Sequence, residues 1–102
     1  MLGQVLAAMQ SVDQLSAALA LYQRLRKQRG ESIARETFAQ RHDFHLPDGS
    51  EQQARDALML SKLDKTIDCE FPSRWQCPIR QPWLFGYDAV EETEAALRET
   101  PL

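Results

Sequence analysis

Two histidines and two cysteines are the residues of this chain whose types could hold a metal ion. His42 and His45 stand three positions apart, and seven residues separate Cys69 from Cys77. Structural zinc sites place roughly two to four residues between paired cysteines, so this spacing disfavours a Cys2His2 site. We instead expect reduced, partly buried cysteines, and histidines that face the negative pole of a helix end.

The other reactive side chains form no recognisable catalytic set. The sequence contains no GxGxxG, Walker A, GxSxG or HExxH motif. Three acids at 91, 92 and 94 suit the positive end of a helix and need no catalytic explanation. The dense rings of Trp83–Tyr87 are expected to pack rather than react. The sequence therefore predicts no catalytic, cofactor-binding or metal-binding residue.

Charge is unevenly distributed along the chain. Residues 22–42 carry a net charge of +4, and residues 88–102 carry −4. The basic charges point around a helix rather than along one stripe, and no aromatic residues interleave with them. This pattern favours a solvated face, or a face that docks acidic neighbours, over a nucleic-acid-binding surface.

The elements that position these residues are predicted to be mostly helices. Apolar residues three and four apart predict a short helix over about 2–10. Ser11 and Gln14 form a capping box that starts a long helix over about 12–42, with Gly30 as its soft point. A turn at 45–49 follows, and Ser50 is expected to cap a helix over about 51–64. Asp88 is expected to cap the last helix, over about 89–99.

Prolines at 72, 78 and 82 predict an extended loop over about 66–87 without a helix. The fold class is thus mostly α: a long helix, shorter helices and an irregular loop rich in proline and aromatic residues. The loop's rings have no strand pattern to receive them. They need a surface from the chain's own helices or from a second chain.

Composition bounds the size of the core. The chain has 102 residues, of which 43% are apolar and 23 are Leu, Ile, Val or Phe, so its core must be thin. No apolar run is long enough for a membrane span, and no basic residue precedes Arg24, which argues against a secretory signal. Two cysteines and a net charge of −3 exclude a disulfide scaffold and a bulk polycation.

Three stretches in this order resemble a known family. They are residues 18–29 (ALALYQRLRKQR), residues 44–49 (FHLPDG) with QARD at 53–56, and residues 83–89 (WLFGYDA). Together they are similar to the C-terminal region of the FAD-dependent aromatic hydroxylases, the salicylate hydroxylase-like monooxygenases. The similarity covers essentially the whole chain and implies the fold of their C-terminal subdomain, with residues 1–102 as a single unit.

The resemblance also implies what this chain lacks. Members of the family are much longer, with a GxGxxG-bearing flavin domain and a second flavin motif containing Gly-Asp, neither of which occurs here. We therefore expect a truncated or split FAD-dependent monooxygenase, of a kind found in fungal secondary metabolism, that is inactive alone. FAD and NAD(P)H are the cofactors of the family, and none is expected on this chain by itself.

An alternative is a non-catalytic helical module that pairs with itself or with a partner. Under either hypothesis the expected partner is a flavin-domain chain or a second copy, with no nucleic acid and no membrane, in the cytoplasm. The predicted partner surface consists of Leu15, Leu19, Tyr22, Ile33, Trp75, Trp83 and Phe85.

Overall fold

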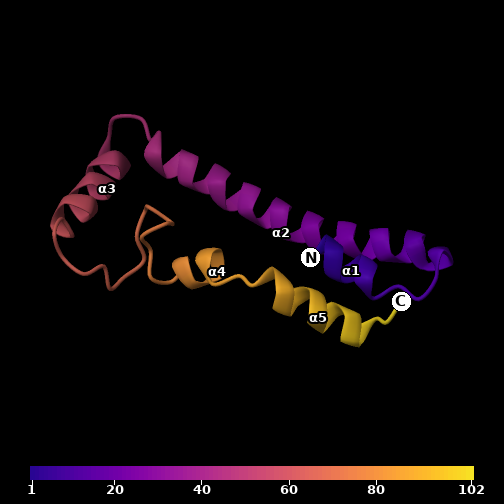
Figure 1. The fold of residues 1–102 in the computed structure, drawn as a ribbon. Helices are drawn as coiled ribbons and strands as arrows, with labels where there is room; N and C mark the ends of the chain where they lie inside the picture. Colours follow the sequence, from indigo (N-terminus) through magenta and orange to yellow (C-terminus); the bar gives the residue numbers. More distant parts are fainter. The chain divides into compact units, whose positions relative to one another are not determined.

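The computed structural model describes residues 1–102, and its regular elements are all helical. In chain order they are α1 (Leu2–Ala7), the 3-10 helix η1 (Val12–Gln14), α2 (Leu15–Phe44), α3 (Ser50–Ser61), α4 (Gln81–Phe85) and α5 (Ala89–Glu99), as Figure 1 shows. The predicted mostly α class is confirmed. No helix is both long and apolar enough to cross a membrane.

Two compact units make up the chain. The first combines Met1–Ser32 with Asp88–Leu102, and the second is Ile33–Tyr87. Helix α2 contributes its first half to one unit and its second half to the other. The grouping of all 102 residues as one C-terminal-type subdomain stays a prediction.

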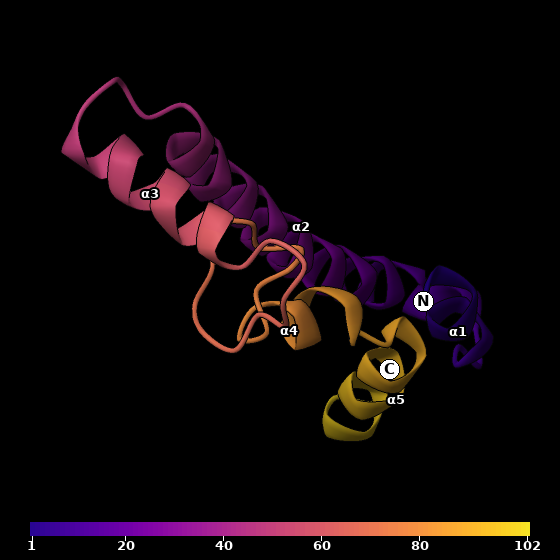
Figure 2. The same ribbon diagram turned by 90° about the vertical axis from the view of Figure 1, so that its left-hand side faces the viewer.

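The first unit is built around a small apolar core. Val5 of α1 and Ala18 of α2 are fully buried, and Leu21 is nearly so. Ala18 and Leu21 are three residues apart and therefore share a face of α2. Helix α1 runs beside this half of α2 in both views (Figures 1 and 2) and also packs on α5. The packing is completed by Met9, Leu25, Ala96, Leu97 and Leu102.

Both capping predictions in this unit are confirmed. Ser11 and Gln14 form the expected capping box, and the Gln14 side chain accepts the Ser11 backbone N–H at 3.2 Å. The Asp88 carboxylate accepts the backbone N–H groups of Val90 at 2.7 Å and of Glu91 at 3.2 Å. Each cap satisfies donors that the first turn of a helix leaves without an internal partner.

The second unit begins where α2 ends. His45 donates its backbone N–H to the carbonyls of Arg41 and His42, and the chain then turns into α3. The prediction that Ser50 caps this helix is wrong: Gly49 is the N-cap residue, and Ser50 is already helical. Gly49 has φ of +157°, a value more accessible to glycine than to other residues, and its carbonyl accepts the Gln53 N–H.

The prediction of a helix-free loop over 66–87 is also wrong at one place. Residues Gln81–Phe85 form α4, with Pro82 in its first turn. Proline is tolerated there because the first N–H groups of a helix have no intrahelical acceptor in any case. The other two prolines, at 72 and 78, lie in irregular structure as expected.

Candidate functional site

A polar stripe on the second half of α2 holds the irregular segment that follows α3. Glu36, Gln40 and Asp43 are spaced four and three residues apart, which places them on one face of the helix. Arg74 lies against this stripe, donating Nε–H to the Glu36 carbonyl oxygen at 3.1 Å and pairing with the Glu36 carboxylate at 3.2 Å. Its Nη2 lies 3.8 Å from Asp43 Oδ2.

The backbone is fixed at the same point. The Gln40 side chain, 9% exposed, accepts the backbone N–H of Arg74 at 2.9 Å. Arg80 adds a second cation, with Nη1 3.8 Å from Glu36 and Nη2 3.3 Å from Glu70. We call these five residues (Glu36, Gln40, Asp43, Arg74 and Arg80) the polar clamp.

Helix α3 is joined to the end of α2 by Arg55. Its Nη1 donates to the Asp43 carbonyl oxygen at 2.7 Å, while Nε and Nη2 donate to the Asp56 carboxylate. Hydrogen bonds from Arg55 and Gln52 hold the pKa of Asp56 below its ordinary value. Beyond α3, a 2.6 Å bond from Lys62 lowers the pKa of Asp68, and the same bond raises the pKa of Lys62.

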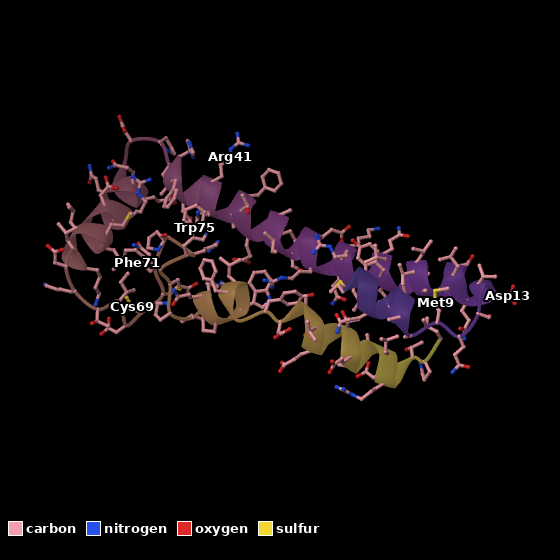
Figure 3. All side chains as sticks on the ribbon, in the orientation of Figure 1. Met9, Asp13, Arg41, Cys69, Phe71 and Trp75 are labelled. Atoms are coloured by element: carbon pink, nitrogen blue, oxygen red, sulfur yellow. The ribbon has the colours of Figure 1, made fainter.

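The clamp leaves several large apolar side chains facing outward. Trp75 directly follows the clamped Arg74 and is 62% exposed. Figure 3 labels it on the segment between α3 and α4, together with Phe71 and Cys69. Ile79, Trp83 and Phe85 are exposed as well, and with Trp75 they form what we call the aromatic segment. Phe71 differs from them because it is 5% exposed and packs inside the unit.

The predicted partner-surface residues fall into both units. In the first, Leu15 and Leu19 are exposed on α2, one helical turn apart, and Tyr22 beside them is half-buried. In the second, Ile33 is half-buried. The remaining three, Trp75, Trp83 and Phe85, belong to the aromatic segment. Leu15, Leu19 and Tyr22 thus lie on the part of α2 in the first unit, Ile33 and the aromatic segment lie in the second unit, and their role in partner binding stays a prediction.

The cysteines and histidines lie in different surroundings. Cys69 is a half-buried free thiol and Cys77 a fully buried one. His42 and His45 stand at the end of α2, where His45 Nδ1 lies 2.9 Å from the Arg41 carbonyl oxygen. No three residues among the histidines, cysteines and acids are arranged to hold a metal ion.

Two hollows occur in the second unit. One, of about 280 Å³, lies over Phe71, Leu46 and Leu58, but its arginines, Arg55 and Arg74, are engaged with protein acceptors. The other, of about 330 Å³, is lined by Phe38, Arg41, His42 and His45. Pockets for drug-sized ligands span about 300–1,000 Å³, so these two hollows lie at or just below the lower end of that range.

Sequence reasoning missed the polar clamp. Glu36 contributes only to the net charge predicted for residues 22–42, and no sequence pattern singles out Arg74 or Arg80. A signal was available in the spacing of Glu36, Gln40 and Asp43, which form an acidic and amide stripe on an otherwise basic helix. Nothing local indicated that this stripe would bind residues more than thirty positions further along the chain.

Comparison with known proteins adds a specific relative. No family model matches the chain. The chain is 42% identical, over 101 residues, to the FAD-dependent monooxygenase OpS4 of Beauveria bassiana (strain ARSEF 2860). The alignment covers 99% of this chain and 23% of that enzyme, so the chain spans about a quarter of the relative's length. Nearly all of this chain is thus similar to a fragment of an FAD-dependent monooxygenase.

Proposed function

We propose that this chain is a part of an FAD-dependent monooxygenase of the aromatic hydroxylase kind and that it is inactive alone. The observation that carries the proposal is the 42% identity across 99% of the chain to one portion of such an enzyme. The fungal origin of that relative supports a setting in fungal secondary metabolism.

In this proposal the chain supplies a docking surface rather than reacting groups. The polar clamp fixes the backbone at Arg74, immediately before Trp75, so the aromatic segment is held in place although its rings are exposed. Exposed apolar groups on an anchored backbone are suited to packing against another protein surface, because little conformational entropy remains to be lost. The proposed partner is the flavin-binding part of the enzyme, which would hold FAD and NAD(P)H.

Complementation tests this role. The portion of the Beauveria enzyme outside the aligned segment is co-expressed with this chain, and bound FAD and NAD(P)H oxidation are measured. We expect the two chains to co-purify with FAD and oxidise NAD(P)H, and this chain alone to bring down no flavin. A stoichiometric flavin on the purified 102-residue chain would contradict the proposal.

Matched variants locate the surface. Trp75→Gln with Phe85→Gln removes two exposed rings without touching the polar clamp, and should weaken co-purification by at least about tenfold if they anchor the interface. Phe38→Gln removes an equally exposed ring, 66% accessible, outside the aromatic segment and serves as the control. Equal loss in both variants would argue against the aromatic segment as the docking surface.

A self-associating helical module is the second candidate, supported by exposed Leu15 and Leu19 on one face of α2. Sedimentation across a concentration series, with Leu15→Glu/Leu19→Glu as the variant, tests it: a dimer that the variant dissociates supports self-association, and a concentration-independent monomer refutes it. A cytoplasmic location also belongs to the proposal and is supported by the two free thiols. Cell fractionation tests it.

A further inference from the structure

We propose that Asp48 is a modification site, at which the aspartate isomerises to isoaspartate through a succinimide formed with the backbone nitrogen of Gly49. The two residues lie in the turn between α2 and α3 (Figure 1), and both are exposed. This proposal concerns the chain's own covalent chemistry and does not depend on the monooxygenase assignment.

The first observation is that the reacting atoms are already neighbours in the covalent structure. The Asp48 side-chain carbon Cγ and the Gly49 nitrogen close a five-membered ring through rotations within Asp48 itself. Because Gly49 has no Cβ, no side chain crowds the attacking nitrogen. Asp48–Gly49 is the one Asp-Gly pair in the chain.

The second observation is that the fold does not use the reacting groups. Gly49 is the N-cap residue of α3, and the first N–H groups of a helix have no acceptor within the helix. Neither the Gly49 N–H nor the Asp48 carboxylate takes part in a hydrogen bond or an ion pair. The nitrogen can therefore attack the side chain without breaking a native contact.

Asp43 shows how the fold restrains the same chemistry elsewhere. It precedes Phe44 near the end of α2, where the backbone N–H of Phe44 belongs to the hydrogen-bonded helix. The Asp43 carboxylate also lies 3.8 Å from Arg74 Nη2. Ring closure at Asp43 would break both interactions, whereas Asp48 has neither restraint.

The reaction needs only water as a co-reactant. The Gly49 nitrogen attacks Cγ of the protonated Asp48 carboxyl, a C–N bond forms, the Cγ–OH bond breaks, and the amide proton leaves with that oxygen as water. Water then adds to one of the two imide carbonyl carbons. Addition at the Asp48 backbone carbon, with cleavage of its bond to nitrogen, leaves isoaspartate, and addition at Cγ restores aspartate. The net change is an isomerisation without a change in mass.

Isomerisation alters the connection that begins α3. The main chain then runs through Cβ and Cγ of residue 48, so it gains one carbon atom, and the free carboxylate moves to Cα. On one side of this point α3 is held to α2 by Arg55, which donates to the Asp43 carbonyl at 2.7 Å. The Gly49 carbonyl accepts the Gln53 N–H at 3.0 Å. A longer connection displaces Gly49, so we expect this last hydrogen bond to be lost.

Isoaspartate mapping of the whole chain tests the proposal. The folded chain is kept in neutral buffer, and isoaspartate is counted at intervals by methyl transfer from labelled S-adenosylmethionine with an isoaspartate-specific carboxyl methyltransferase. Trypsin cleaves after Arg41 and Arg55, so the peptide of residues 42–55 carries both Asp43 and Asp48. Electron-transfer fragmentation of this peptide identifies the isomerised residue. We expect isoaspartate to accumulate at Asp48 and not at Asp43.

Asp48→Glu is the matched control, because it keeps the charge of an exposed side chain but requires a six-membered ring, which closes far more slowly. It should abolish methyl transfer and leave the circular dichroism spectrum unchanged. A parallel incubation in concentrated guanidinium chloride measures the reaction without the fold. Isoaspartate at Asp48 in the unfolded chain alone, or in neither sample, would overturn the proposal, as would equal amounts at Asp43 and Asp48 in the folded chain.

Hydrogen exchange of the separated isoaspartate form tests the structural consequence. Protection of the Gln53 N–H should be lost relative to the unmodified chain, because its acceptor on Gly49 has moved. Unchanged protection of this N–H would refute the claim that isomerisation alters the start of α3.

Discussion

The two compact units are held together by different interactions. In the first, Val5, Ala18 and Leu21 are removed from water and the surrounding contacts are apolar. In the second, the segment after α3 is fixed to α2 chiefly by Arg74, Arg80 and their acceptors, while Trp75 and Phe85 remain exposed. The same long helix thus presents an apolar face in one half and a polar stripe in the other.

The difference shows how a chain with a small core can keep apolar side chains exposed for contact with a partner. The burial of apolar groups is non-directional, and a ring that is buried in the core cannot also contact a partner protein. Hydrogen bonds and ion pairs are directional, so they can fix the position of a segment without consuming its rings. The polar clamp therefore makes the aromatic segment ordered and exposed at once.

The largest expected loss of stability is in the first unit, which has the apolar core. Leu21→Ala removes a side chain that is 5% exposed, and we expect the free energy of unfolding to fall by about 3 kcal/mol because a cavity replaces buried methyl groups. Denaturant titration followed by far-UV circular dichroism measures this loss. Both tryptophans lie in the second unit, so tryptophan fluorescence should shift less. Equal shifts by both probes would mean that the units unfold as one.

A variant of the polar clamp should lower the free energy of unfolding by a smaller amount, and the loss should be in the second unit rather than the first. Arg74→Met keeps an apolar stem but leaves Asp43 without its cation and Glu36 with Arg80 alone, and we expect a loss of about 1–2 kcal/mol because these groups are only partly buried. Here tryptophan fluorescence should respond first, since Trp75 adjoins Arg74.

Arg41→Met is the matched control for the clamp. Arg41 projects from α2 on the side away from the segment that carries Trp75 (Figure 3), and it is exposed. Its substitution should change the free energy of unfolding by less than about 0.5 kcal/mol. If the two variants lose the same stability, general charge rather than the polar clamp supports the second unit.

The contrast also explains what the sequence could predict. Helical spacing and local caps at Ser11 and Asp88 were readable because each depends on residues within one or two turns. Ala18, Leu21 and Leu25 pack in the core of the first unit, whereas Leu15 and Leu19 of the same helix remain exposed. Whether an apolar residue at helical spacing is covered depends on which elements return to it, and local sequence does not contain that information.

The second unit was less predictable for the same reason. Pro82 predicts the absence of a helix when it is considered alone, but its place in the first turn of α4 is compatible with one. The clamp joins Glu36 and Gln40 to Arg74 across a turn, a helix and an irregular segment. Pairings over such separations follow from tertiary structure, and the spacing of single residues does not specify them.

Two glycine-to-alanine substitutions near the boundaries of the two units are expected to change stability in opposite directions. A Cβ added at Gly30 in α2 meets nothing within 4 Å, so Gly30→Ala should stabilise the chain by about 1 kcal/mol through higher helix propensity. At Gly86 the added Cβ would clash with the Pro82 backbone carbonyl oxygen, so Gly86→Ala should destabilise α4. Thermal melting of both variants should therefore give shifts of opposite sign, and shifts of the same sign would contradict this assignment.

Acid should destabilise the second unit more than the first. This is the smallest expected effect because the carboxylates concerned, Asp56 and Asp68, are accessible to solvent. The pKa values of Asp56 and Asp68 are lowered by their bonds to Arg55 and Lys62. A carboxyl with a lowered folded-state pKa stabilises the fold above its unfolded value of about 3.9, and this stabilisation is lost as pH falls below that value. The tryptophan-detected denaturation midpoint should therefore drop on acidification, and Asp56→Asn/Asp68→Asn should reduce the drop. An unchanged acid response in this double variant would contradict the assignment to Asp56 and Asp68.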